Sequence, residues 1–166
     1  EDERGRVIDR LGEARIAVVS LPMCNMYLQD RAPARTPRWR GVAPLHELRA
    51  AGAPVMVASD NTRDPFHAYG DLDMLEVFRE ATRILHLDHS TNDWLRAVAA
   101  TPADLMGLDR AGRLEAGDPA DMILMPARST DELLARPHAD RLVIVAGRAI
   151  DARPPDYAEL DDLMRR

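Results

Sequence analysis

The chain has 166 residues, 46% of them hydrophobic and 30% charged, a composition typical of a globular protein with a buried core. Its formal net charge of −6 argues against a nucleic-acid-binding protein, and no apolar stretch reaches the roughly 20 residues of a membrane-spanning helix. The single cysteine excludes an internal disulfide and a cysteine-rich zinc site, which fits a reducing cytoplasm, where we expect the protein to be located.

The first third of the chain predicts two short buried strands joined through a helix. Residues 2–14 have apolar positions at helical spacing, and residues 16–21 form an apolar run that ends at Pro22. A long loop rich in proline and arginine is expected to about Gly41. A short helix over 45–51 and a buried strand over 54–58 follow. This order is a βαβ unit, so the two strands are predicted to be parallel neighbours.

The remaining sequence predicts helices first and short strands afterwards. Residues 72–87 carry apolar stripes on two faces, as in a helix held between layers. Ser90-Thr91-Asn92 offers caps for a helix over 94–100, and Thr101 is expected to cap a helix that ends at Gly107. Beyond residue 108 we expect a strand over 120–125, a helix over 131–135, strands over 142–146 and 149–150, and a helical segment over 157–166.

Asp60 is the leading candidate for a catalytic residue. It follows the buried strand over 54–58, at the carboxyl end, which is where α/β barrels keep their catalytic groups. The alternative is that Asp60 only begins an Asx-type turn, as aspartates at strand ends often do. The residues alone leave both readings open.

Other reactive side chains have weaker claims to a functional role. Cys24 is either a nucleophile or a small buried apolar residue, and its apolar neighbour Met23 favours the second reading. His86 and His89 have a spacing that could serve a metal, but no acidic or histidine partner is placed near them. Of the remaining histidines, His46 is expected in a short helix and His67 after the loop that begins at Asp60. His138 is expected in a surface turn.

An arginine cluster interrupts the acidic character of the chain. Arg31, Arg35, Arg38 and Arg40 surround Trp39. Such a cluster can bind phosphates and stack on bases. The competing interpretation is a loop that packs on its own protein or on a neighbour.

Several motifs resemble the amidohydrolase superfamily. The sequence GLDRAGRLEAGDPADMILMP over residues 107–126 is similar to the segment that returns the chain of these proteins to a small β-domain, and ATPADLMGL over 100–108 resembles the helix before it. NMYLQDR over 25–31 and DNTRDPF over 60–66 are similar to the cytosine deaminase branch. The resemblance spans roughly residues 15–150.

The resemblance implies an α/β fold. Residues 1–107 would be the C-terminal part of a (β/α)8 TIM-type barrel, residues 108–150 part of a small β-sandwich domain, and residues 151–166 a C-terminal tail. Two strands cannot close a barrel. The other strands would therefore come from another chain or from a further part of the same polypeptide. The alternative is that these residues fold alone as a small α/β domain.

The resemblance also implies metal-dependent hydrolytic deamination of cytosine or a related small heterocycle. One divalent metal ion, zinc or iron, would be bound by Asp60 and by histidines in the N-terminal part of the barrel. Asp60 would also act as the catalytic base, with Asn61, Phe66 and Asn25 at the substrate, while Asp64 would brace the loop. We expect a homo-oligomer with neither nucleic-acid nor membrane partners.

One departure from the family pattern leaves the substrate open. Bacterial cytosine deaminases usually have a second acid where this chain has Asn61. An amide both donates and accepts hydrogen bonds, whereas a carboxylate only accepts. Two alternatives therefore stay open: another amidohydrolase reaction, such as triazine N-dealkylation or cyclic amide hydrolysis, and a non-enzymatic fragment or subunit of this fold.

Overall fold

A computed structural model of the protein describes residues 2–89, 93–151, 153 and 156–165. The chain forms two compact units, Glu1–Arg113 and Leu114–Arg166. None of the helices in the described part of the chain combines the length and the apolar character needed to cross a membrane. The first unit contains every residue that the sequence proposes for the site.

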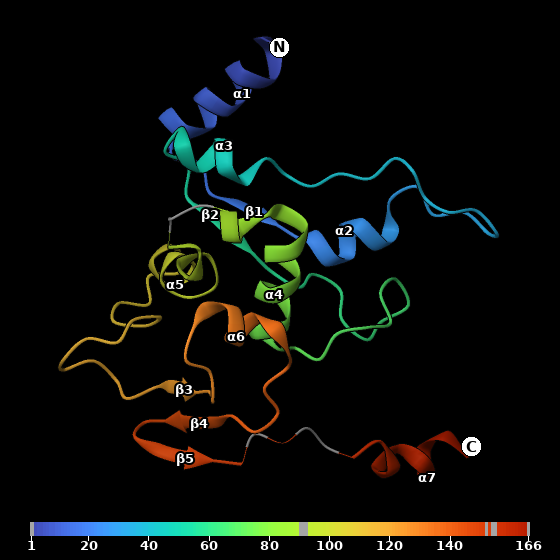
Figure 1. The fold of residues 1–166 in the computed structure, drawn as a ribbon, viewed down its shortest axis with the longest axis vertical. Helices are drawn as coiled ribbons and strands as arrows, with labels where there is room; N and C mark the ends of the chain where they lie inside the picture. The colour runs from blue at the N-terminus through green and yellow to red at the C-terminus, as the bar shows by residue number, and fades with distance from the viewer. Residues whose placement is uncertain (1, 90–92, 152, 154–155, 166) are drawn as a thin grey trace. The chain divides into compact units, whose positions relative to one another are not determined.

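The first unit begins with a long helix and alternates afterwards between short strands and helices (Figure 1). Its elements are α1 (Asp2–Glu13), β1 (Val18–Ser20), α2 (Pro22–Leu28), α3 (Leu45–Ala50), β2 (Val55–Val57), α4 (Met74–Leu85), the 3-10 helices η1 (Leu87–His89) and η2 (Trp94–Val98), and α5 (Ala100–Leu105).

The two strands are parallel neighbours, as the sequence predicts. Val18 lies opposite Val55, and Ser20 lies opposite Val57. The ladder continues for one more residue, because the amide of Ala58 donates to the carbonyl of Ser20 at 3.0 Å.

The two faces of this sheet differ in burial. Val55, Val57 and Ser20 are buried, and β2 contacts the helices α3, α4, η2 and α5. Val19 points to the opposite face and is 47% exposed. Helices of this unit therefore cover one face of the sheet and leave the other open.

Helix α4 is shorter than predicted and has one buried side. Asp73 caps its N-terminus by accepting from the Leu75 amide at 3.0 Å, so the helix begins at Met74. Leu72 lies before the cap, in a left-handed conformation, and is 83% exposed. The predicted start at Leu72 is therefore wrong. The buried side chains are Leu75, Val77, Phe78, Ala81, Thr82 and Leu85.

Two predicted caps have other outcomes. Thr101 lies inside α5, which starts at Ala100 and has no side-chain cap, so the predicted cap is wrong. The proposed caps at Ser90-Thr91-Asn92 lie outside the described residues, and the helix after them is the 3-10 helix η2.

Helices α1 and α3 contact each other, and Gly12 of α1 lies directly against the end of α3. A Cβ atom at Gly12 would lie 2.0 Å from the carbonyl oxygen of Ala51, so the two backbones leave no room for a side chain. We expect Gly12→Ala to lower the free energy of unfolding by about 1–3 kcal/mol, the usual cost of overpacking. Thermal or denaturant unfolding measures this loss.

Gly5 in the same helix provides a matched control, because a Cβ there meets no atom within 4 Å. Gly5→Ala should stabilise the helix by up to about 1 kcal/mol, since alanine has the higher helix propensity. Equal effects of the two substitutions would contradict the close approach of α1 and α3.

The second unit contains a three-stranded antiparallel sheet in the order β3 (Met122–Leu124), β4 (Leu142–Val145) and β5 (Arg148–Ile150). Ala146 and Gly147 join β4 to β5, both with positive φ, as a tight two-residue hairpin requires. The other elements are the helix α6 (Thr130–Ala135), the 3-10 helix η3 (Tyr157–Leu160) and the helix α7 (Asp161–Met164).

His138 is not in a surface turn, as the sequence suggested, but is 1% exposed. Its Nε2 lies 3.2 Å from the carbonyl oxygen of Glu132 and 3.1 Å from that of Leu133. An N–H at Nε2 can donate to both carbonyls at the end of α6. The buried ring thus contacts the C-terminal end of α6 through Nε2, while its Nδ1 has no hydrogen-bond partner among the described residues.

Candidate functional site

Asp60 lies just beyond the carboxyl end of β2 and is exposed. Its φ of 62° places it in the left-handed region, which aspartate tolerates better than most residues. The backbone thus turns sharply where the chain leaves the sheet. The structure places the carboxylate at the strand end where the sequence predicts it.

Helix α2 brings Cys24 beneath this strand end. The segment after Pro22 was predicted to be a loop up to Gly41, but residues 22–28 are helical. The reason is that Pro22 occupies the first turn of a helix, where proline is favoured, rather than only ending β1. Cys24 is fully buried, with its Sγ 3.6 Å from Oδ1 of Asn61.

The environment of Cys24 disfavours a thiolate. Burial raises the pKa of the Cys24 thiol, and the adjacent Asp60 carboxylate and the negative charge of Asp64 act in the same direction. A backbone hydrogen bond from Asn61 opposes them more weakly. Since only the thiolate is a strong nucleophile, Cys24 fits the structural interpretation and not the nucleophilic one.

Asn25 does not follow a strand end directly, as the sequence suggested. It lies in the middle of α2, where its amide donates to Leu21 and its carbonyl accepts from Gln29, both at 3.0 Å. The predicted strand-end position of Asn25 is wrong because a helix, and not a loop, starts at Pro22.

Asn61 and Asp64 are joined across the loop after β2. Nδ2 of Asn61 donates to Oδ2 of Asp64, whose Oδ1 accepts from the amides of Phe66 at 2.9 Å and His67 at 2.8 Å. These hydrogen bonds, with that from Asn61 the strongest, hold the pKa of Asp64 below its usual range. Asp64 therefore braces the loop, as predicted. The Phe66 ring is 65% exposed.

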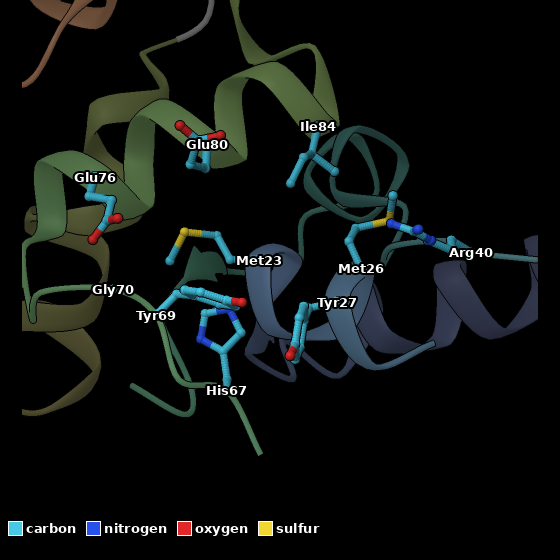
Figure 2. A pocket seen from close by; sticks show the side chains of 10 residues that line it. All are labelled: Met23, Met26, Tyr27, Arg40, His67, Tyr69, Gly70, Glu76, Glu80 and Ile84. Atoms are coloured by element: carbon cyan, nitrogen blue, oxygen red, sulfur yellow. The ribbon is translucent and has the colours of Figure 1, made fainter. Parts of the chain in front are cut away.

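A cavity of about 330 Å³ lies between α2, α4 and the segment 67–70 (Figure 2). The rings of Tyr27, His67 and Tyr69 meet edge to face there, with centroids 5.1–5.6 Å apart. Nδ1 of His67 is 3.1 Å from the carbonyl oxygen of Asn61. If Nδ1 carries the proton, Nε2 is left as an acceptor. The other lining residues are Met23, Met26, Arg40, Gly70, Glu76, Glu80 and Ile84.

Sequence reasoning missed this aromatic cluster. None of Asp60, Asn61, Phe66 and Asn25 lines the cavity. The available signal was the alternation of His67 and Tyr69 after the Asp-Pro turn, which places both rings on one side of an extended segment.

Among the described residues, the histidines do not gather into a cluster that could hold a metal ion. No group of three or more histidine, cysteine, aspartate or glutamate side chains that could hold a metal ion occurs within the described ranges. Nε2 of His46 lies 3.0 Å from the carbonyl oxygen of Leu85, and its ring packs edge-on against Trp94. The ring centroids of His86 and His89 are 5.7 Å apart.

The arginine cluster is partly packed on its own chain. Asp30 pairs with Arg35 and also accepts from the amides of Arg38 at 2.6 Å and Trp39 at 3.1 Å. Arg31 stacks over the Tyr27 ring at 4.3 Å. These contacts favour the packed loop over a phosphate-binding surface, although Trp39 itself is 82% exposed.

The comparisons with known proteins establish the family. Residues 1–151 match the amidohydrolase family, and the chain therefore belongs to it. A pterin deaminase from Rhizobium rhizogenes is 57% identical over 164 residues, which are 99% of this chain and 38% of that protein. The resemblance read from the sequence is confirmed.

Two solved structures have a similar fold. The 5-methylcytosine deaminase from Klebsiella pneumoniae, liganded with 5-fluorocytosine, has a TM-score of 0.73 and 25% identity, over 95% of this chain and 38% of that one. The N-isopropylammelide isopropylaminohydrolase from Burkholderia multivorans has a TM-score of 0.62 and 27% identity, over 90% of this chain and 35% of that one. This chain thus spans well under half the length of these proteins.

Proposed function

We propose that this chain forms the C-terminal part of a metal-dependent deaminase that hydrolyses an amino-substituted heterocycle. The observation that carries the proposal is the 57% identity to a pterin deaminase over nearly the whole chain. The position of Asp60 at the carboxyl end of a parallel strand supports it, because barrel enzymes perform their chemistry at that end.

We also propose that β1 and β2 are the last two strands of a TIM-type barrel. The parallel pairing, the helices on one face and the open face at Val19 all fit a barrel wall. Residues 1–107 would belong to the barrel, residues 108–150 to a small β-sandwich domain and residues 151–166 to a tail. The remaining strands, with the histidine ligands, would come from the N-terminal part of the enzyme.

The residues present fit one ligand position of a metal site. Asp60 offers an exposed carboxylate at the strand end, and the part of the chain described by the structure has no group of three ligand side chains that could hold the ion by itself. Asp60 would hold a zinc or iron ion together with histidines from the rest of the protein. When bound, such an ion lowers the pKa of water and makes hydroxide available near neutral pH.

Asp60 has the central part in the proposed reaction. A carboxylate oxygen of Asp60 accepts a proton from the attacking water while the water oxygen adds to the ring carbon. The Asp60 carboxyl group then gives this proton to the amino nitrogen, and the C–N bond breaks to release ammonia. Overall, one ring N=C–NH2 unit and one water give one ring NH–C=O unit and one ammonia molecule, because the second proton of the water ends on the ring nitrogen.

We propose a pterin as the first substrate to test, because the pterin deaminase is 57% identical to this chain. Cytosine and 5-methylcytosine come second, since the fold resembles that of a 5-methylcytosine deaminase. An N-alkylated triazine is the third candidate, based on the likeness to the N-isopropylammelide isopropylaminohydrolase. In each case Asn61, Phe66 and Asn25 are proposed to contact the ring.

Ammonia release by the full-length, metal-loaded enzyme tests the proposed function. Pterin, cytosine, 5-methylcytosine and an N-alkylammelide should be compared under identical conditions. We expect the largest kcat/KM for pterin. Turnover of the alkylammelide alone, with release of the alkylamine, would favour N-dealkylation. No turnover of any of these compounds by a metal-loaded, folded enzyme would contradict the proposal.

Phe66 is expected to bind the flat face of the substrate. Its ring is 65% exposed and therefore free to stack. Phe66→Ala in the complete enzyme should raise KM by about 2- to 10-fold with little change in kcat, which corresponds to the usual strength of an aromatic pair. Steady-state kinetics measure both constants, and Phe66→Tyr serves as the control that keeps a ring. An unchanged KM in the alanine variant would contradict the contact.

A further inference from the structure

The loop after β2 has a backbone that needs support. Asp60 and Arg63 have φ values of 62° and 53°, in the left-handed region that disfavours residues with a side chain. Such conformations cost free energy and persist only where surrounding contacts hold them. The contacts that hold this loop therefore also determine where the Asp60 carboxylate lies.

Asp64 is the centre of these contacts. Its carboxylate accepts from the Asn61 side chain and from the amides of Phe66 and His67. Its own amide donates to the carbonyl of His67 at 3.2 Å, and the amide of Arg63 donates to the carbonyl of Tyr69 at 3.2 Å. One carboxylate thus joins the first residue after Asp60 to the far side of the turn.

Asn61 connects this turn to the neighbouring βα segment. A carboxylate only accepts hydrogen bonds, so Nδ2 of Asn61 must face Asp64, and Oδ1 then faces Sγ of Cys24 at 3.6 Å. Cys24 belongs to α2, the helix that directly follows β1. The main-chain carbonyl of Asn61 is also 3.1 Å from Nδ1 of the buried His67.

We propose that Cys24, Asn61 and Asp64 form a clasp that fixes the loop carrying Asp60 and ties it to the segment after β1. Within the proposed deaminase, on which this inference rests, Cys24 and Asp64 are positioning residues. They act through Asn61 and the loop backbone, not on the substrate. Asn61 has a second role beside its proposed contact with the ring, because it transmits the constraint from α2 to the neighbour of Asp60.

Asp64→Asn in the full-length enzyme tests the clasp. In the variant, the new side-chain NH2 group would take the place of the oxygen that accepts from Nδ2 of Asn61, so two hydrogen-bond donors would face each other. Flipping Asn61 would turn its Nδ2 towards Cys24 Sγ, which is only a weak acceptor. We expect kcat to fall by about 10- to 100-fold, because misplacement of a reacting group by about 1 Å has effects of that size. The bound metal content should be retained.

Two readouts that do not depend on turnover should change with Asp64→Asn. Hydrogen exchange at the amides of Phe66 and His67 should become faster, since both donate to the Asp64 carboxylate. The fully buried Cys24 should react faster with a thiol reagent, as measured by peptide mass spectrometry at one fixed pH.

Asp71→Asn provides the matched control. Asp71 is in the same loop region and loses the same charge, but its side chain pairs with Arg63 at the exposed surface. Exposed ion pairs contribute little, so kcat should change by less than about twofold. Hydrogen exchange and thiol reactivity should remain at the wild-type values.

The exchange variant Asn61→Asp combined with Asp64→Asn separates the clasp from substrate recognition. It reverses donor and acceptor but keeps one hydrogen bond between the two positions. We expect it to restore slow hydrogen exchange and slow labelling of Cys24. A loop as mobile in the exchange variant as in Asp64→Asn would overturn the inference, as would wild-type exchange and labelling in Asp64→Asn. If the wild-type enzyme deaminates nothing, the proposed function fails, while these two readouts still decide on the clasp.

Discussion

Asp60→Asn is expected to lower kcat of the complete enzyme by about 10²–10⁴-fold, the usual contribution of a positioned general base. The amide keeps the size of the side chain but cannot accept and return the proton. Asparagine also tolerates the left-handed conformation that the backbone has at this position, with a φ of 62°. The loop should therefore keep its shape, and the free energy of unfolding should change little.

Metal analysis of the purified variant separates two causes of this loss. An amide is a poorer ligand than a carboxylate, so lower metal content would add to the loss of the base. Asp88→Asn, which changes an exposed acid in η1, is the control and should leave kcat unchanged. An Asp60→Asn enzyme with more than about a tenth of the normal kcat would show that Asp60 is only a turn residue, because removal of a base costs more than this.

The second large effect is expected for the isolated segment. Residues 1–166 expressed alone should show no ammonia release, because Asp60 is the only proposed ligand and no cluster of three ligand side chains occurs in the part that the structure describes. The segment should also associate in solution. Val19 is 47% exposed on the open face of the sheet, and the two paired strands have no further strand neighbours within the described residues.

Light scattering, calorimetry and an ammonia assay on the purified segment measure this prediction. The control is the full-length protein at the same metal concentration. A monomeric segment with a cooperative unfolding transition and measurable turnover would support the alternative that these residues fold and act as a small α/β domain.

The sequence was informative where local chemistry and tertiary structure agree. The apolar run before Asp60 predicts a buried strand, and its pairing with β1 follows from the helix between them. Gly147 predicts a turn between two strands, and the structure has the hairpin there, with the turn at Ala146 and Gly147 and with Arg148 already in β5. The strand-end position of Asp60 follows from the same pattern.

The sequence failed where a residue has two possible local roles and distant contacts decide between them. Pro22 can end a strand or begin a helix, and in the structure it begins α2, whose Cys24 is fully buried. His138 was predicted in a surface turn, but it is buried against the end of α6. The cavity beside Tyr27, His67 and Tyr69 combines segments far apart in the sequence, so the alternation of His67 and Tyr69 alone does not predict it.

Neighbouring residues of the β1–β2 pair lie on different sides of the sheet, so we expect different constraints on their substitution. Val55 and Val57 are buried on the helix-covered side of the sheet, whereas Val19 points to the open side. Among natural homologues, changes at Val55 and Val57 should therefore covary with positions in α4, η2 and α5. Changes at Val19 should covary with positions outside these 166 residues. The two sides of this strand pair would thus show two independent sets of covarying positions, one for each side of the proposed barrel wall.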